Sequence, residues 1–286
     1  MKTRLALAVL IALALPSHAQ EPPPAAAQVQ AATAQVAHPW EQAQAVVAEV
    51  DADVTRKGLR GVGSHVDDLE NALAQAPGAF AAAATGDADA VYVLTDNPSD
   101  TLIALMGAAV ADQKNPGAEK RRTVAVHNPY PTIALYLGTY YNEIDKPVDA
   151  LRVFDAEKAL PESFRGLFVE AAPIAGERAI ALVKLGRLPE ALAVYDEGIK
   201  LSATDARLRA RMQRGRGYVL TELGRLDEAE AAYQESLKIE PDSQLAKREL
   251  EYITRLRFGG TPAPSQIITV KPQTPAGDHP APGTSP

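Results

Sequence analysis

Histidine and serine are the residues of this sequence that are best suited to metal binding or catalysis. Outside the first 19 residues, histidines occur at His38, His65, His127 and His279. None is spaced three or four residues from another, and no His-Glu-x-x-His motif is present, so no metal site is predicted. Gly63-Ser64-His65 puts a serine beside a histidine, but sequence neighbours rarely have catalytic-triad geometry, and neither G-x-S-x-G nor S-x-x-K occurs. These observations predict a non-enzymatic protein without a cofactor.

The glycines around this serine have a conformational explanation. Gly58, Gly61 and Gly63 resemble a phosphate-binding loop in spacing, but the lysine that ends such a loop is missing. They predict a turn, in which Ser64 caps a helix that Pro77-Gly78 ends. The chain also contains no cysteine, which excludes disulfides, thiol catalysis, cysteine-based zinc sites and a lipoprotein anchor.

A cluster of arginines is the most distinctive polar feature. Its members are Arg207, Arg209, Arg211, Arg214 and Arg216. Such a cluster would suit an acidic or carboxylate-bearing peptide segment. The alternative is that the arginines pair with nearby acids, since the chain has a formal net charge of −7. An acidic chain is a poor general partner for nucleic acid or anionic membranes.

The arginines lie inside a sequence repeat. Leu185-Gly186-Arg187-Leu188 recurs, 38 residues later, as Leu223-Gly224-Arg225-Leu226, and Tyr195 recurs as Tyr233. Self-similarity at such a period is typical of stacked helical repeats. The expected fold is therefore mainly α, an antiparallel helix-hairpin solenoid.

The repeat resembles the tetratricopeptide repeat, a helix A–turn–helix B unit of about 34 residues. The match is strongest in residues 210–243 and weaker in 172–205 and 131–164, and an insertion with Phe164, Leu167 and Phe168 separates the two weaker copies. The structural positions that fit the family pattern are Gly138, Ala150, Phe154, Gly186, Ala191, Tyr195, Gly217, Gly224, Ala229, Tyr233 and Pro241. Residues 243–257 are expected to form a capping helix, with Leu245, Ile253 and Leu256 packed inward together with either Leu250 or Tyr252.

The resemblance implies a binding surface. In the family, the A helices line a concave groove, and the positions that commonly face a bound peptide are occupied here by Thr139, Asn142, Arg211, Arg214 and Tyr218. The residues with which chaperone-binding members grip a peptide C-terminus are absent, which disfavours that ligand. The resemblance therefore implies a protein or peptide partner of unspecified identity, acidic if the arginines recognise it.

The remaining chain divides by composition. Residues 1–19 are interpreted as a signal peptide and residues 20–38 as a disordered leader. Residues 39–130 are expected to form a helical N-terminal region, and the sequence leaves open whether this region derives from degenerate repeats. Residues 131–257 are expected to form the solenoid, and residues 258–286 a disordered proline-rich tail. The signal peptide predicts an exported bacterial protein in the periplasm, with secretion as the alternative. No integral membrane span is expected after its removal, and the oligomeric state is left open.

The N-terminal third carries two β-branched stretches. Residues 90–96 and 123–126 form either short strands that pair, or, for the first, a buried helical turn, with a helix through Leu102, Met106 and Val110 between them. This region gives an alternative to an interaction scaffold of the cell envelope. In that alternative, an enzyme or small-ligand site lies within residues 40–130, near His127, Asn128 and Tyr130, and the repeats are accessory.

Overall fold

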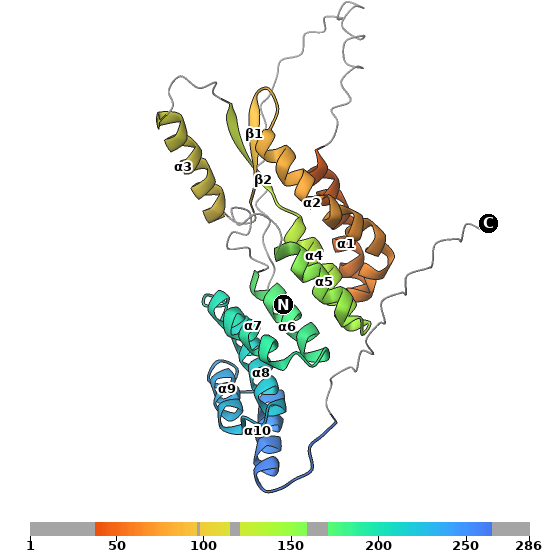
Figure 1. Ribbon diagram of the computed structural model, residues 1–286, viewed down its shortest axis with the longest axis vertical. Coiled ribbons are helices and arrows are strands. Elements are labelled where there is room, and N and C mark those ends of the chain that lie inside the picture. The colour runs from red at the N-terminus through yellow and green to blue at the C-terminus, as the bar shows by residue number, and fades with distance from the viewer. Residues whose placement is uncertain (1–37, 96–97, 115–120, 159–170, 265–286) are drawn as a thin grey trace, which may run out of the picture. The chain divides into compact units, whose positions relative to one another are not determined.

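The computed structural model describes residues 38–95, 98–114, 121–158 and 171–264. In chain order the elements are α1 (Pro39–Lys57), the 3₁₀ helix η1 (Gly58–His65), α2 (Val66–Thr85), β1 (Ala90–Thr95), α3 (Pro98–Lys114), β2 (Arg122–His127), α4 (Tyr130–Glu143), α5 (Pro147–Lys158), α6 (Ala171–Lys184), α7 (Leu188–Leu201), α8 (Ala206–Glu222), α9 (Leu226–Ile239) and α10 (Gln244–Arg257) (Figure 1). The expected signal peptide, nearly all of the leader, the insertion around Phe164 and the tail from residue 265 lie outside the described residues.

Helix α2 differs from the prediction at both ends. Pro77 does not end it, and the helix continues to Thr85 because Phe80 and Ala83, beyond the proline, are buried. An internal proline removes one backbone hydrogen bond, and burial of this apolar face offsets that loss. Ser64 is not the N-cap either. Its hydroxyl donates to the Gly61 carbonyl within η1, which leads directly into α2.

The two β-branched stretches form paired strands. β1 and β2 run parallel, with Ala90 opposite Arg122 and Thr95 opposite His127, and α3 connects them. The strand alternative is therefore confirmed over the buried helical turn. The aromatic ring of Tyr92 lies 5.1 Å from that of Trp40, whose ring is stacked on His38, so β1 packs against the start of α1.

The turns of the solenoid confirm the register read from the sequence. Asp145, Gly186 and Gly224 follow the A helices α4, α6 and α8, and their φ angles are +56°, +70° and +72°. In each turn the next residue donates a backbone hydrogen bond to the carbonyl four residues before the turn residue, over 2.8–2.9 Å. Glycine adopts this left-handed conformation without steric penalty, and Asp is among the few other residues that tolerate it.

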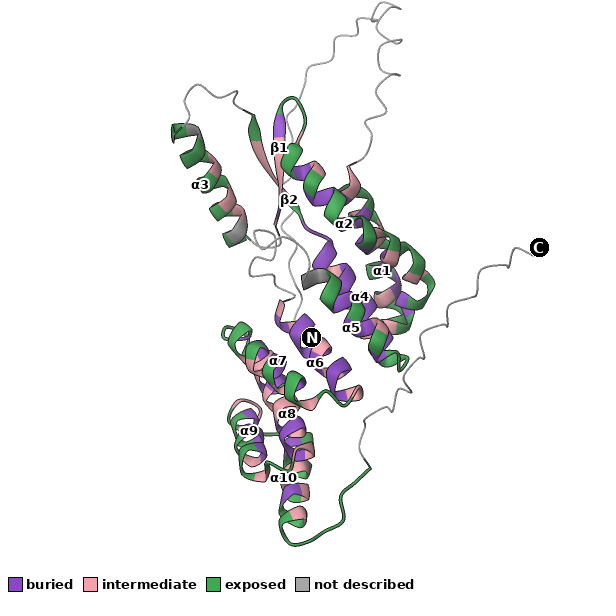
Figure 2. Ribbon diagram, viewed as in Figure 1, coloured by how far each residue is buried: buried purple, intermediate pink, exposed green. Residues whose placement is uncertain are grey.

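Close helix packing explains the small residues of the repeat. A Cβ atom on Gly138 would lie 2.1 Å from the Phe154 ring, and one on Gly217 would lie 2.8 Å from the Tyr233 ring. Ala150, Ala191 and Ala229 are fully buried in the B helices. Figure 2 shows the buried residues on the facing sides of these paired helices. Three helical hairpins followed by α10 therefore form the expected mainly α solenoid.

The capping helix packs through Ile253 and Leu250 as expected, but not through Leu245. Ala246 and Ile253 are buried and Leu250 packs against them, whereas Leu245 is 49% exposed. Residues four and three apart lie on one side of a helix, so the stripe Ala246, Leu250, Ile253 faces α9 and turns Leu245 away from the core. The expected inward packing of Leu245 is wrong, and its side chain is available to another surface.

Candidate functional site

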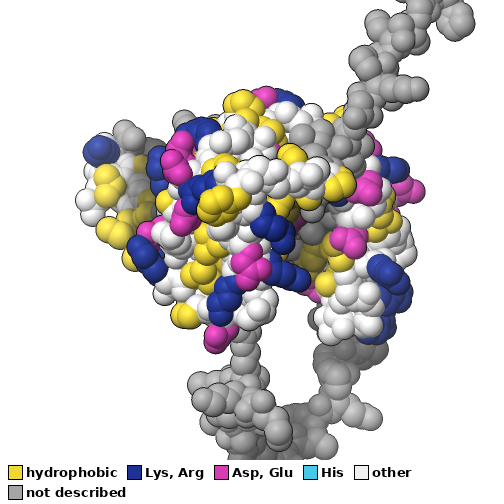
Figure 3. Space-filling view, turned by 90° about the horizontal axis from the view of Figure 1, so that it is seen from below, with side chains coloured by type: hydrophobic (Ala, Val, Ile, Leu, Met, Phe, Trp, Pro, Cys, Tyr) yellow, Lys and Arg dark blue, Asp and Glu magenta, His cyan; other side chains and the backbone are white. Residues whose placement is uncertain are grey.

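An open groove lies between the helices α6, α8 and α10, in the C-terminal part of the solenoid. It has a volume of about 430 Å³. Its lining residues are Gly176, Ile180, Val183, Lys184, Tyr195, Arg211, Met212, Arg214, Gly215, Tyr218, Tyr233, Leu245 and Glu249. Figure 3 shows the chain from below, the side on which α8, α9 and α10 lie in Figure 1, with Lys and Arg side chains close to Asp and Glu side chains and hydrophobic side chains exposed between them. The groove therefore offers an apolar floor with a charged border.

Two glycines give the groove its depth. A Cβ atom on Gly215 would lie 2.4 Å from the ring of Tyr195, and one on Gly176 would lie 2.6 Å from the terminal methyl of Met212. The aromatic ring and the thioether therefore reach the floor because the adjacent A helices carry no side chain there. Burial raises the pKa of Tyr195 above its ordinary value, so its hydroxyl, already neutral at neutral pH, stays uncharged at more alkaline pH as well.

The first arginine of the groove belongs to a polar chain that crosses three A helices. Arg211 on α8 forms an ion pair with Glu177 on α6, and Glu177 is only 8% exposed. Glu177 Oε2 also accepts a hydrogen bond from Asn142 Nδ2 on α4 over 3.2 Å, and the Glu177 carbonyl accepts a second over 2.9 Å. The result is that Asn142 and Arg211 are joined through one carboxylate.

Every arginine of the cluster has a partner. Arg214 pairs with Glu240 and donates to the Ser236 hydroxyl over 3.1 Å, Arg216 pairs with Asp196 over 2.8 Å, and Arg209 donates to the Ala203 carbonyl over 2.7 Å. Arg207, with 93% of its side chain exposed, lies 3.7 Å from Glu240. Four of the five arginines therefore pair with acids of the same chain, as the alternative interpretation expected, and Arg209 bonds to a backbone carbonyl. The groove consequently has little uncompensated positive charge.

The sequence-predicted binding residues divide into two groups. Arg211, Arg214 and Tyr218 line the groove, whereas Asn142 is buried and reaches it only through Glu177. Thr139 is outside the groove lining, and its hydroxyl is buried without a hydrogen-bond partner among the described residues.

Sequence reasoning missed the contribution of α10. Leu245 and Glu249 line the groove, and burial raises the pKa of Glu249. Their spacing of four residues on a predicted helix was a usable signal, since it places both on one side. This spacing was overlooked because Leu245 was expected to pack into the core.

The comparisons with known proteins agree with this architecture. A family model described as Tetratricopeptide repeat matches residues 177–244, from α6 to the first residue of α10. Residues 177–244 therefore carry tetratricopeptide repeats. Tetratricopeptide repeats generally mediate protein–protein interactions and are typically non-catalytic.

Two further comparisons add no functional information. No curated protein matches the chain. The crystal structure of BtubC (BKLC) from P. vanneervenii is 13% identical over 83% of this chain and 99% of that chain, with a TM-score of 0.36. Similarity at this level supports no conclusion about fold or function.

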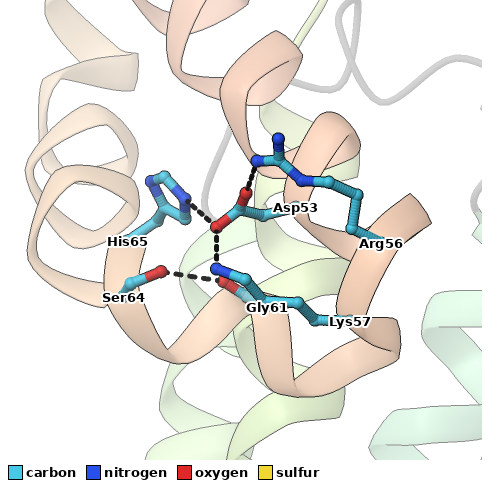
Figure 4. A network of polar contacts seen from close by, with 6 residues as sticks. All are labelled: Asp53, Arg56, Lys57, Gly61, Ser64 and His65. Atoms are coloured by element: carbon cyan, nitrogen blue, oxygen red, sulfur yellow. Dashed lines mark hydrogen bonds and ion pairs between the residues drawn. The ribbon is translucent and has the colours of Figure 1, made fainter.

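The serine–histidine pair outside these repeats is not arranged as a catalytic dyad. Ser64 Oγ donates to the Gly61 carbonyl over 3.2 Å, while His65 Nε2 faces Asp53 Oδ2 at 3.4 Å (Figure 4). Lys57 and Arg56 also bond to Asp53 and hold the pKa of its carboxyl well below the ordinary value. The network joins α1 to η1 and is a structural ion cluster.

The residues of the alternative N-terminal site differ in their exposure to solvent. His127 is exposed at the end of β2, and its carbonyl accepts a hydrogen bond from Gln44 over 2.7 Å. Asn128 and Tyr130 are 1% and 0% exposed, so neither is accessible to a substrate from solution. The described residues contain no group of three or more His, Asp or Glu suited to a metal ion. Within the same residues, no helix combines the length and apolarity needed to cross a membrane.

Proposed function

We propose that this chain binds a peptide or an extended protein segment in the groove between α6, α8 and α10, and that it acts as an interaction or assembly scaffold without catalysis. The observation that carries the proposal is the apolar floor formed by Ile180, Met212 and Tyr218, bordered by Leu245 on α10. A groove with a few polar groups at its border suits a side chain or two of a bound segment. The tetratricopeptide repeat, which generally mediates protein–protein interactions, supports the same function.

The charge distribution indicates which segments suit the groove. Arg211 and Arg214 are held by Glu177 and Glu240, so an acidic segment would have to displace a carboxylate that is already in place. Removing a paired charge from its partner is costly when the partner is buried, as Glu177 is. We therefore favour a mainly apolar segment over the acidic one that the arginine cluster alone would predict.

The compartment is a separate part of the proposal. Residues 1–19 have the basic start, the apolar run from Leu5 to Leu15 and the small residues of a cleavable secretory signal, and they support a periplasmic location in the cell envelope. Fractionation of the producing cells, with N-terminal sequencing of the mature protein, tests this. A mature chain that begins near residue 20 in the periplasmic fraction is expected, and an uncleaved chain in the cytoplasm would contradict it.

A matched pair of substitutions tests the groove. Leu245 and Val148 are both exposed aliphatic residues, at 49% and 54%, but only Leu245 lines the groove. We expect Leu245→Arg to abolish binding of peptides selected from a displayed random library against the wild-type chain, because it places a charge directly beside the apolar floor. Val148→Arg should leave binding unchanged. Equal binding by both variants would show that the selected peptides bind elsewhere.

A further inference from the structure

The chain beyond α10 turns back along that helix. Gly259 adopts a φ of +80°, and the Gly260 amide donates to the Arg255 carbonyl over 2.9 Å, which ends the helix and reverses the chain. Three residues later, the Ala263 amide donates to the Tyr252 hydroxyl over 2.8 Å. The described residues therefore end at Pro264 with the chain directed along α10.

The contact at Tyr252 lies on the side of α10 that borders the groove. Leu245, Glu249 and Tyr252 are spaced by four and three residues, so they share one side of the helix. Leu245 and Glu249 line the groove. Ala263 is consequently held at one end of the same strip of surface that leads into the apolar floor.

The next residues are long enough to reach the groove. Tyr252 and Leu245 are separated along the helix axis by about 10 Å at 1.5 Å per residue. An extended chain covers this distance in about three residues at 3.3 Å each. Counted from Ala263, the segment Ser265–Val270 would therefore pass Leu245 and cross the groove.

The chemistry of this segment fits the groove as well as its length does. Residues 265–270 read SQIITV and carry no charge, so their docking would require no ionic group to be desolvated. In an extended chain, alternate side chains point to the same side, which places Ile268 and Val270 together. The groove, whose arginines are already paired with acids, offers these two side chains an apolar floor.

We propose that residues 265–270 of the chain occupy its own groove, with Ile268 and Val270 toward the floor, and that an external segment binds only when they leave. This inference rests on the proposed function, because it concerns the same groove. The tether between Ala263 and Ile268 is short, so the local concentration of the segment is about millimolar or higher. The segment therefore acts as a built-in competitor that sets the affinity for outside partners.

Disulfide trapping tests the position of the segment. The chain has no native cysteine, so only introduced thiols can react. We expect the full chain with Leu245→Cys and Ile268→Cys to form an intramolecular disulfide under mild oxidation. The matched control is Lys247→Cys with Ile268→Cys, because Lys247 is exposed on the opposite side of α10. Equal trapping by both pairs, or a disulfide-linked dimer in place of a linked monomer, would overturn the proposal.

Binding in trans tests the competition. The probe is a labelled synthetic peptide of residues Ala263–Lys271, added to the full chain. If the segment occupies the groove about nine-tenths of the time, its release lowers the apparent Kd of the probe about tenfold. We expect this gain with Ile268→Asp plus Val270→Asp, and none with Ile267→Asp plus Thr269→Asp, whose side chains point the other way. The same Kd for both variants would contradict the proposal.

The outcomes separate this inference from the proposed function. If Leu245→Arg abolishes binding of library peptides but the two cysteine pairs react equally, the groove binds outside segments and self-occupation is refuted. If the Leu245 pair is trapped selectively but no library peptide binds even after Ile268→Asp plus Val270→Asp, the groove is an internal seat and the proposed function is refuted.

Discussion

The Glu177 carboxylate on α6 pairs with the Arg211 guanidinium on α8, two residues 34 positions apart in the sequence. The acid is buried at the edge of the groove, and its side chain is 10% exposed while that of Arg211 is 51% exposed. The pair therefore joins two consecutive A helices. Arg211 is consequently not an unpaired cation in the groove. A residue that the sequence offers as a ligand contact has a structural role in the folded chain.

Breaking this pair should destabilise the fold. Arg211→Met leaves the Glu177 carboxylate buried with only its Asn142 contact, and we expect the free energy of unfolding to fall by about 1–3 kcal/mol. Combining it with Glu177→Gln should recover about 1 kcal/mol, because no charge is then left unpaired. Urea unfolding of the single and double variants measures both. Arg207→Met, at a 93% exposed side chain, is the control and should change the stability by less than about 0.5 kcal/mol.

Gly138 should not tolerate a methyl group. A Cβ atom there would lie 2.1 Å from the Phe154 ring, which is fully buried and cannot move aside freely. We expect Gly138→Ala to lower the free energy of unfolding by about 1–3 kcal/mol through overpacking. A Cβ atom on Gly107 of α3 would meet no other atom within 4 Å, so Gly107→Ala should stabilise the chain by about 0.5–1 kcal/mol. Similar thermal unfolding midpoints for the two variants would contradict this explanation.

Local packing signals made the solenoid predictable from the sequence. Gly186 and Gly224 are required by the left-handed turns, and Ala191 and Tyr195 by helix contacts, so each is specified by its own repeat. The errors arose where long-range packing decides the outcome. Helix α2 passes Pro77 because Phe80 and Ala83 are buried against other elements, a consequence that no local pattern contains.

The candidate site was less predictable than the fold for the same reason. Arg211, Arg214 and Tyr218 line the groove, as their repeat positions predicted. Which of these charges remains available depends on pairs such as Arg211 with Glu177 and Arg214 with Glu240, which join different helices. The sequence shows that acids and arginines are both abundant, but only the folded chain shows which of them meet.

Acid should selectively weaken the contact between α2 and the first repeat. Partial burial raises the pKa of Glu70, but hydrogen bonds from Arg152 and Tyr141 more than offset this, and the pKa lies below its ordinary value of 4.5. A carboxylate with a lowered pKa stabilises the fold above its ordinary pKa, and the contribution is lost as the pH falls through the folded value. Wild type should therefore be more stable than Glu70→Gln at pH 6, and the difference should shrink as the pH falls below about 4.

Chemical denaturation across this pH range measures that difference. Glu197→Gln, at an exposed position of α7, is the matched control for the loss of one carboxylate. Its stability relative to wild type should show no comparable change. A Glu70→Gln difference that stays constant between pH 6 and pH 3 would show that the hydrogen bonds to Arg152 and Tyr141 do not depend on the charge of Glu70.

The charges at the groove predict how its ligands respond to salt. Because Arg211 and Arg214 are paired internally, peptides selected by the wild-type chain should be apolar and not enriched in Asp or Glu. Their Kd should change less than about twofold between roughly 50 and 300 mM salt, since screening acts mainly on unpaired charges. Glu177→Gln plus Glu240→Gln frees both arginines, and this variant should select acidic peptides whose binding weakens with salt. Strong acidic selection by the wild type would show instead that the ligand displaces Glu177 and Glu240 from the arginines.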